Sequence, residues 1–422
     1  MSNSNGFKVK DGVLERYFGK DTQVVIPDGI TVIGDSAFRD CYDIVSVFIP
    51  ESVVEIRNHA FFDCCNLTNI LLPKNLTKIG DFAFSCCRRI ESFTLPESVT
   101  EIGSSAFSFC VDLTEIDIPF GVEKINQSTF KGCSCLRRIT IPKSIKSIDK
   151  LAFKGCTHIE SIEIPESVVS IGEDAFVGCL YLESITVAID NPNYYSQNNC
   201  IIKYKNKALI LGCKNSIIPC DGRVESIGKG AFKGCLKLAY IKIPNSITKI
   251  GDSAFEGCEM LISVEIPKGI TKINNSVFLG CKNLVSVSIP DSVTLIDTQA
   301  FAYCSNLQNI EIPESVTFIG NSAFIGCSSL VSVKIPNSVT SLCTSAFDLC
   351  TSLCSIEFSN KLTKIGELFW LCFNLKNVII PNSVTKISNS AFDGCEDLVI
   401  ITPAESYASK YAENKNIKVN LT

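Results

Sequence analysis

The sequence predicts a repeat solenoid, a coil of short turns stacked on one another with a parallel β-sheet along one side. Two residue types carry the prediction: fifteen of the 23 cysteines recur every 23 residues within two runs, and a phenylalanine recurs with them. The single exception is the step of 22 residues from Cys350 to Cys372. A repeat of this length is one structural unit that stacks on the next.

The ladder cysteines are Cys41, Cys64, Cys87, Cys110, Cys133, Cys156, Cys179, Cys235, Cys258, Cys281, Cys304, Cys327, Cys350, Cys372 and Cys395. The ladder phenylalanines are Phe38, Phe61, Phe84, Phe107, Phe130, Phe153, Phe176, Phe232, Phe255, Phe278, Phe301, Phe324, Phe347, Phe369 and Phe392.

Each repeat reads C-x-x-L-x-x-[IV]-x-I-P-x-S-V-x-x-I-G-x-x-A-F-x-G from its ladder cysteine. In residues 263–267, Val264 and Ile266 alternate with polar residues, which predicts a short strand with these two side chains facing inward. Pro267 ends the strand because proline has no N–H to donate. One turn cannot bury its apolar residues alone, so stacked turns about 4.8 Å apart are expected to share one core.

Breaks in the period divide the chain. The step from Phe176 to Phe232 is 56 residues, which leaves 33 residues beyond one period. Within this insertion, residues 200–204 and 208–211 flank a Lys-Asn-Lys turn and predict a β-hairpin. Residues 404–414 have alanine and tyrosine at helical spacing, which predicts a short helix over the last turn.

We therefore expect five regions. They are an N-terminal β-hairpin cap (1–27), a first array of seven repeats (28–188), the hairpin insertion (189–222), a second array of eight repeats (223–403), and a C-terminal capping helix with a tail (404–422).

The repeat resembles the BspA-type leucine-rich repeat, a 23-residue class of the leucine-rich repeat superfamily, over nearly the whole chain. The general superfamily pattern L-x-x-L-x-L-x-x-[NC]-x-L is met in its first half only, because I-P-x-S-V replaces the Asn/Cys segment. The resemblance implies a right-handed coil used mainly for binding, on the surfaces of bacteria and of some parasitic protists. Its better-known members look like adhesins, and the family has no catalytic motif to transfer.

Composition argues against several functions. The net charge of −5, with 39 Lys and Arg against 44 Asp and Glu, does not favour nucleic acid as a partner. His59 and His158 lie in different repeats without a nucleophile motif nearby, so we expect no enzyme, no cofactor and no metal site. The sequence has no apolar stretch typical of a signal peptide or a membrane span. We expect a cytoplasmic protein, with the cell surface as the alternative.

The cysteines allow two interpretations. In stacked turns, ladder cysteines about 4.8 Å apart are close enough for disulfides, but their side chains point the same way and suit small buried positions. We expect reduced core thiols, as in a reducing compartment. The alternative is a thiol redox or metal-binding protein. The more reactive thiols are then expected off the ladder, at Cys65, Cys86, Cys135, Cys200, Cys213, Cys220, Cys343 and Cys354.

The outward positions of the predicted sheet are the candidate binding surface. Small polar residues dominate five residues after each ladder cysteine, and residues of both charge signs occur two residues later. A row of both signs can fix the register and choice of a protein partner, although such a row also simply keeps a sheet soluble. The candidate binding residues are Tyr240, Lys242, Glu265, Glu311, Lys334 and Glu357.

Two apolar residues interrupt this polar pattern near the N-terminus. Phe48 and Leu71 are outward positions, and we expect them to pack under the N-terminal cap. Tyr240 is the one aromatic residue in the first outward column, so protein is favoured over carbohydrate as the ligand.

The sequence thus predicts a non-catalytic protein that offers an extended surface for protein binding or scaffolding. The alternative is a cell-surface adhesin that binds host or neighbouring-cell proteins. The partner and the oligomeric state stay open.

Overall fold

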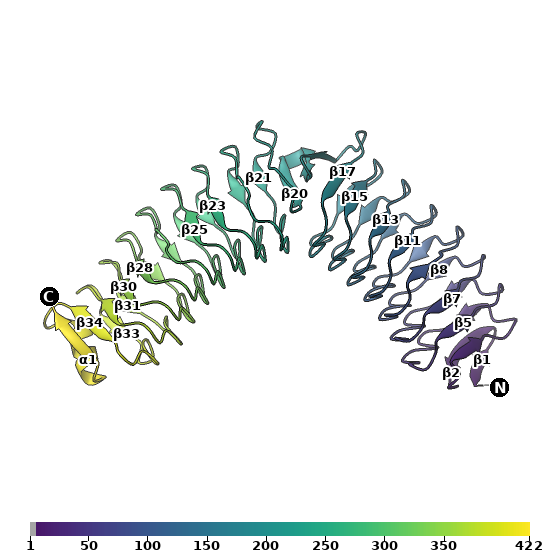
Figure 1. Cartoon of the computed structure of the whole chain (residues 1–422), viewed down its shortest axis with the longest axis horizontal. Coiled ribbons are helices and arrows are strands. Elements are labelled where there is room, and N and C mark those ends of the chain that lie inside the picture. The colour runs from purple at the N-terminus through teal and green to yellow at the C-terminus, as the bar shows by residue number, and fades with distance from the viewer. Residues whose placement is uncertain (1–5) are drawn as a thin grey trace. The chain divides into compact units, whose positions relative to one another are not determined.

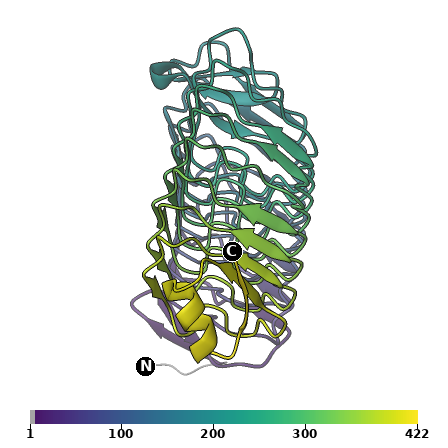
Figure 2. The same ribbon diagram turned by 90° about the vertical axis from the view of Figure 1, so that its left-hand side faces the viewer.

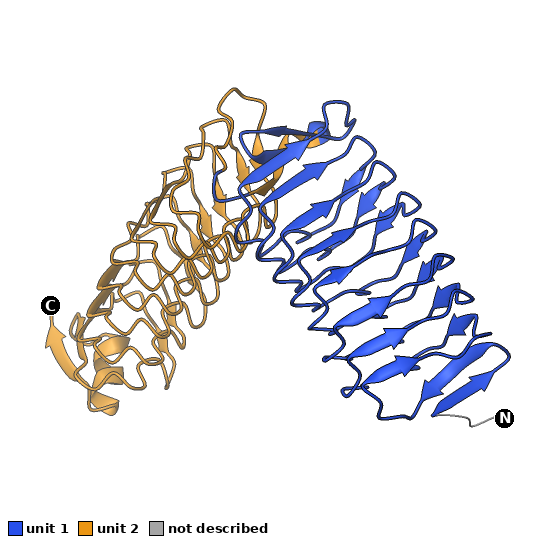
Figure 3. Cartoon of the chain, turned by 45° about the vertical axis from the view of Figure 1, so that its right-hand side comes forward, with its two compact units in different colours: residues 1–205, 213–215 blue, residues 206–212, 216–422 orange. Residues whose placement is uncertain are grey.

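A computed structural model describes residues 6–422 and contains two compact units (Figure 3). Unit 1 comprises residues 1–205 and 213–215, and unit 2 comprises residues 206–212 and 216–422. Each unit is a β-solenoid of stacked turns, about 18 turns in total, in which parallel strands of successive turns lie side by side (Figure 1). The predicted fold class is confirmed.

In unit 1, each turn contributes one face strand, which lies in the exposed sheet, and one shorter side strand. The face strands are β3 (Gln23–Val25), β5 (Ser46–Phe48), β7 (Asn69–Leu71), β9 (Ser92–Phe93), β11 (Glu115–Asp117), β13 (Arg138–Thr140), β15 (Ser161–Ile164) and β17 (Ser184–Val187). The side strands are β4 (Val32–Ile33), β6 (Glu55–Ile56), β8 (Lys78–Ile79), β10 (Glu101–Ile102), β12 (Lys124–Ile125), β14 (Ser147–Ile148) and β16 (Ser170–Ile171).

Unit 2 is built in the same way, except that residues 240–243 and 309–312 form no face strand. Its face strands are β23 (Ser263–Glu265), β25 (Ser286–Ser288), β28 (Ser332–Lys334), β30 (Ser355–Glu357), β32 (Asn377–Ile379), β34 (Val399–Thr402) and β35 (Lys418–Leu421). Its side strands are β20 (Ala208–Gly212), β21 (Ser226–Ile227), β22 (Lys249–Ile250), β24 (Lys272–Ile273), β26 (Leu295–Ile296), β27 (Phe318–Ile319), β29 (Ser341–Leu342), β31 (Lys364–Ile365) and β33 (Lys386–Ile387).

Paired strands of neighbouring turns keep a fixed register. Ser263 pairs with Ser286 and Val264 with Val287, a shift of one 23-residue period. Along β23 the exposed and buried residues alternate as predicted, with Val264 buried between Ser263 and Glu265. The inward positions therefore align in columns that run along each unit.

The stacked phenylalanines form the largest of these columns. The rings of Phe38 and Phe61 lie 4.9 Å apart and nearly parallel, and those of Phe301 and Phe324 lie 5.4 Å apart. These side chains are completely buried. Burial of a phenylalanine in every turn, against its copies above and below, supplies much of the apolar area that stabilises a solenoid.

The ladder cysteines have a second role that the sequence did not reveal. The thiol of Cys64 donates a hydrogen bond to the carbonyl of Phe38 in the preceding turn, over 3.1 Å. The same carbonyl already accepts from the backbone N–H of Cys41. Equivalent thiol bonds, of 3.0–3.5 Å, are made by Cys87, Cys110, Cys133, Cys156, Cys179, Cys258, Cys281, Cys304, Cys327, Cys350 and Cys372.

A cysteine suits this position because it is small and largely apolar, yet carries a weak donor for a buried carbonyl. The residue before it has a positive φ in many turns, which explains the glycine there: Gly257 and Gly280 both have φ of 72°. In other turns Asp63 and Phe109 take the same conformation, with φ of 57° and 58°.

The exposed sheet is less continuous than predicted. In unit 1 the face strands form three groups, β3-β5-β7, β9-β11-β13 and β15-β17, and in unit 2 they form two, β23-β25 and β28-β30-β32-β34-β35. The phenylalanine column nevertheless continues past a break: the ring of Phe301 lies 5.4 Å from those of both Phe278 and Phe324. The phenylalanine column and the side ladder β24-β26-β27-β29 therefore join the turns where the face strands do not pair.

Additional elements lie at the unit ends. The N-terminal hairpin pairs β1 (Phe7–Lys10) with β2 (Val13–Tyr17), and β2 continues into the side ladder through β4. In the insertion, β18 (Tyr194–Gln197) pairs antiparallel with β19 (Cys200–Lys203), a pairing that the sequence did not predict. A short 3-10 helix, η1 (Tyr204–Asn206), follows.

The C-terminal helix α1 (Tyr407–Asn414) covers the last turns of unit 2 (Figure 2). Ser406 caps it, because its side chain accepts a hydrogen bond from the N–H of Ser409. The Tyr411 ring packs edge-on against Phe392, the last of the phenylalanine column. After the helix, β35 adds a parallel strand to β34, an element that the sequence analysis missed.

Candidate functional site

The exposed sheet of unit 2 places the predicted binding residues on one face. Glu265 ends β23, Lys334 ends β28 and Glu357 ends β30. Tyr240 is joined to Ser263 by an isolated bridge and is 69% exposed. Lys242, Glu265, Glu311 and Lys334 are exposed, and Glu357 is half-buried.

The structure brings only some of these charges together. Lys334 and Glu357 face each other in register, and their charged atoms lie 3.5 Å apart. No ion pair within residues 6–422 involves Lys242, Glu265 or Glu311. These three charges stay available to a partner, whereas the exposed Lys334–Glu357 pair contributes little to stability.

Two hollows interrupt this face, one at each place where the ladder of unit 2 is incomplete. The first has a volume of about 610 Å³ and is bordered by Tyr240, Lys242 and Glu265. The second has a volume of about 440 Å³ and is bordered by Glu311 and Lys334. The candidate residues other than Glu357 thus fall into two separate groups.

Sequence reasoning missed several exposed apolar residues on this face. Ile217 borders the first hollow and is 67% exposed. Ile262, Val285 and Val331 are also exposed, and each follows its ladder cysteine by four residues. That spacing was a usable signal, because it defines a third outward column beside the two that were considered.

The expectation for Phe48 and Leu71 is wrong. They lie in register on β5 and β7 and are 53% and 60% exposed, so the N-terminal cap does not cover them. The β1–β2 hairpin of the cap instead extends the side ladder, where β2 pairs with β4. Val25 precedes them in register, so three exposed apolar side chains form a column at the N-terminal end of the face of unit 1.

The thiols differ sharply in environment. Burial raises the pKa of the Cys87, Cys258 and Cys304 thiols well above the ordinary range, and raises the pKa of Cys281 to about 12. Such thiols stay protonated and unreactive at neutral pH. Off the ladder, Cys220 is exposed as expected, but Cys200 and Cys213 are buried, which contradicts their place among the more reactive thiols.

Neither histidine lies in a catalytic arrangement. His59 stacks on Phe82 with a ring separation of 4.9 Å. The Nδ1 atom of His158 lies 2.6 Å from the carbonyl oxygen of Ser134, and its ring stacks on Tyr181. Both rings are held by packing and backbone contacts.

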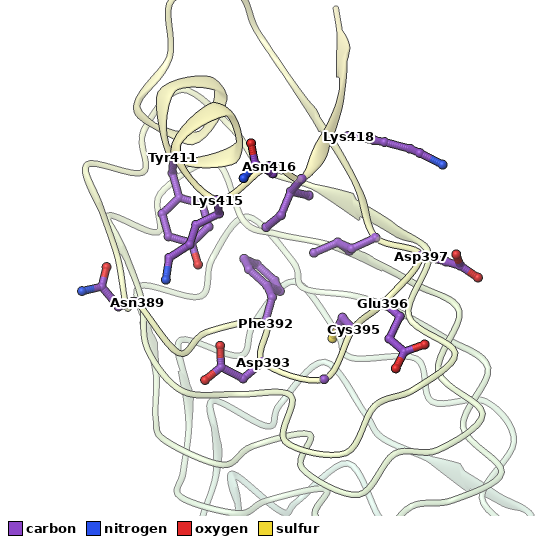
Figure 4. Close-up of a pocket in the computed structure, with 13 residues that line it drawn as sticks. Asn389, Phe392, Asp393, Cys395, Glu396, Asp397, Tyr411, Lys415, Asn416 and Lys418 are labelled. Atoms are coloured by element: carbon purple, nitrogen blue, oxygen red, sulfur yellow. The ribbon is translucent and has the colours of Figure 1, made fainter.

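A further hollow of about 340 Å³ lies between α1 and the last turn of unit 2 (Figure 4). Phe392 and Tyr411 lie at its centre, and acidic side chains such as Asp393 and basic ones such as Lys415 surround them. Cys395 also borders this hollow, and burial raises the pKa of its thiol to about 11. The hollow marks the place where the phenylalanine column ends and the helix fills the space incompletely.

The described residues add two further observations. Residues 6–422 contain no cluster of three or more His, Cys, Asp or Glu placed to hold a metal ion. No helix in this part of the chain has the length and apolar character that crossing a bilayer requires.

Comparison with known proteins identifies the family. The family model for the BspA type leucine rich repeat region, in six copies, matches residues 17–137, 123–208, 210–330 and 271–399. None of the curated proteins matches the chain.

Solved bacterial structures are similar over nearly their whole length. A leucine rich cell surface protein from Faecalibacterium prausnitzii is 28% identical, with a TM-score of 0.64 and coverage of 97% of this chain and 96% of that one. A leucine-rich repeat protein from Bacteroides ovatus is 26% identical, with a TM-score of 0.52 and coverage of 95% and 97%. The pneumococcal vaccine antigen PcpA, 17% identical with a TM-score of 0.51 and coverage of 99% and 98%, shares the fold.

The family match spans most of the chain, and both the 23-residue repeat and the stacked turns agree with it. The chain therefore belongs to the BspA-type leucine-rich repeat proteins.

Proposed function

We propose that this chain is a non-catalytic protein that presents the exposed sheet of unit 2 to a protein partner, for binding or scaffolding. The observation that carries the proposal is the set of unpaired, exposed charges at Lys242, Glu265 and Glu311 on one face of unit 2. Pre-positioned charges of both signs favour one docking register and reject mismatched partners.

Protein fits this face better than carbohydrate does. Sugars commonly stack on aromatic rings, and Tyr240 is the one aromatic residue in the first outward column of unit 2. The exposed aliphatic residues Ile262, Val285 and Val331 flank the small polar column. Apolar contacts beside polar and charged ones are typical of protein interfaces.

The test is affinity capture with a charge-reversed face. The variant Lys242→Glu/Glu265→Lys/Glu311→Lys/Lys334→Glu leaves the net charge unchanged, so a loss of bound proteins reports on the arrangement of charges. We expect the partners of the wild-type protein to be lost. Unchanged partners would remove the proposal.

A matched control reverses four charges of unit 2 that lie outside the exposed sheet. The variant Lys249→Glu/Lys272→Glu/Asp252→Lys/Glu396→Lys also keeps the net charge, and we expect it to retain the wild-type partners.

A cell-surface adhesin is the second candidate. Its support is the similar Faecalibacterium prausnitzii structure, which is named a cell surface protein. This resemblance favours the surface over the cytoplasm as the location. Antibody labelling of intact source cells tests it: labelling is expected for an adhesin, and detection solely in the soluble cytosolic fraction would count against it.

A further inference from the structure

The two hollows of unit 2 occupy equivalent positions in the repeat. The central turn of the first contains Ile241 and Ile243, which belong to no strand, and the central turn of the second contains Ile310 and Ile312. Residues 309–312 make no backbone hydrogen bond to either neighbouring turn within the described chain. The second hollow is therefore a gap in the ladder, whereas at the first a single bridge from Tyr240 to Ser263 remains.

The floor of each hollow is apolar. Ile241, Ile243, Ile310 and Ile312 are 7–9% exposed. Their equivalents in paired strands of this unit, Val264, Val287, Val333 and Ile356, are 1–8% exposed. The floors are thus about as buried as the inward columns elsewhere, and an apolar group that entered the first hollow would also cover the exposed Ile217 and Tyr240.

The rims differ in charge. Lys242 and Glu265 border the first hollow with one charge of each sign. Asp291, Glu311 and Glu314 border the second, together with Lys334, which already pairs with Glu357. None of the three carboxylates has an ion pair within residues 6–422, so the second rim has unneutralised negative charge.

The distance between the two hollows defines the spacing of the two ligand groups that could occupy them together. Ile310 follows Ile241 by 69 residues, which is three periods of 23. Three strand spacings of about 4.8 Å place the two floors about 14 Å apart. Four residues of extended chain span about 13–14 Å, and residues four apart in such a chain point to the same side.

We propose that the two hollows bind one extended segment of a protein partner, which runs across the turns and inserts two apolar side chains four residues apart. A basic residue next to the second anchor would meet the carboxylates of Asp291, Glu311 and Glu314. This inference rests on the proposed function and names the kind of segment that the same face recognises.

Selection from a random peptide library on the whole protein tests it. Selected peptides are expected to share two apolar residues four positions apart, with Lys or Arg beside one of them. Tyr240→Ser and Glu311→Lys, one at each hollow, are each expected to weaken binding about tenfold, as the loss of an interface anchor does. Both positions are exposed, so circular dichroism and thermal unfolding should stay unchanged.

Matched controls separate the hollows from the rest of the surface. Asp117→Lys changes the same outward column in unit 1, outside both hollows, and Tyr303→Ser removes an exposed aromatic residue away from the sheet. Both control variants are expected to bind the selected peptides as the wild type does.

The outcomes also distinguish the two proposals. One outcome is that selected peptides bind the wild type but not the fourfold charge-reversed variant, and yet lack the four-residue spacing and bind Tyr240→Ser and Glu311→Lys normally. That result would overturn this inference and leave the proposed function standing. Anchors about ten residues apart would indicate a helical ligand and would equally overturn it. Failure to select any peptide over the charge-reversed variant would also contradict it.

Discussion

The exposed sheets of the two units rest on the same core and present different chemistry. In unit 1, five successive turns carry charged outward residues, namely Glu91, Glu115, Asp117, Arg137, Arg138, Glu160, Glu163 and Glu183. In unit 2, serine and asparagine fill the middle column apart from Tyr240, exposed aliphatic residues precede it, charges of both signs follow it, and two hollows interrupt the face. Inward residues therefore determine the fold, while outward residues are free to specify a ligand.

High pH should lower the stability of the core in both units, and this is the largest effect we expect. Burial raises the pKa of Cys179 in unit 1 and of Cys281 in unit 2 to about 12. In the unfolded chain a thiol ionises near pH 8.5. Between these values the folded state binds more protons, so the free energy of unfolding falls as pH rises.

Several thiols share this shift, and each unit of pKa corresponds to about 1.4 kcal/mol. Urea denaturation from neutral pH to about pH 11 measures the change. We expect stability to be constant below the unfolded thiol pKa and to decline steadily above it. A flat profile would contradict the buried-thiol column.

Removal of a stacked phenylalanine should have the next largest effect on the free energy of unfolding. The cost should be similar in the two units. Phe107→Ala and Phe301→Ala each leave a cavity in a fully buried column, which costs about 3–5 kcal/mol. Phe120→Ala is the control, because Phe120 is exposed and its loss should cost within about 0.5 kcal/mol. Urea denaturation gives the three values, and equal costs for Phe107 and Phe120 would refute the stacked core.

Loss of one ladder thiol should cost less. Cys87→Ala and Cys304→Ala each remove a donor to a buried phenylalanine carbonyl and leave a small cavity, at a cost of about 1–3 kcal/mol. Cys65→Ala, off the ladder, serves as the control. If Cys87→Ala is as stable as this control in thermal unfolding, the thiol bond has no structural role.

The smallest effect is expected at the apolar column of unit 1. Phe48→Ser should change the unfolding free energy by no more than about 0.5 kcal/mol, because the ring is already exposed. Phe93→Ser replaces a buried ring of β9, two turns further along, and should cost about 3–5 kcal/mol. A large cost at Phe48 would show that this column is covered after all.

The core was predictable because its signal repeats. Leu, Ile, Phe and Cys recur at fixed offsets, and stacking forces each against its copy, as the buried Phe301 and Cys304 show. The thiol bond to the carbonyl of the preceding turn was not predictable, since it depends on backbone geometry. The strand β35 was missed because residues 418–421 pair with β34 without a repeat around them.

The candidate site was predictable in part. Lys242 and Glu265 are exposed, as the alternation within the repeat predicts, although Lys242 lies in no strand. The gaps were not foreseen, because residues 309–313 read Asn-Ile-Glu-Ile-Pro, much like the intact Ser-Val-Glu-Ile-Pro at 263–267. Whether a turn joins its neighbours in a ladder depends on small differences in spacing that sequence does not display.

Hydrogen–deuterium exchange with and without a selected peptide tests the central claim most directly. Backbone amides of residues 309–312 lack ladder hydrogen bonds and should exchange faster in the free protein than those of β28. With peptide bound, the account predicts slower exchange at residues 240–243 and 309–312 and unchanged exchange in unit 1. Slower exchange on the charged face of unit 1, or no change at the two gaps, would contradict it.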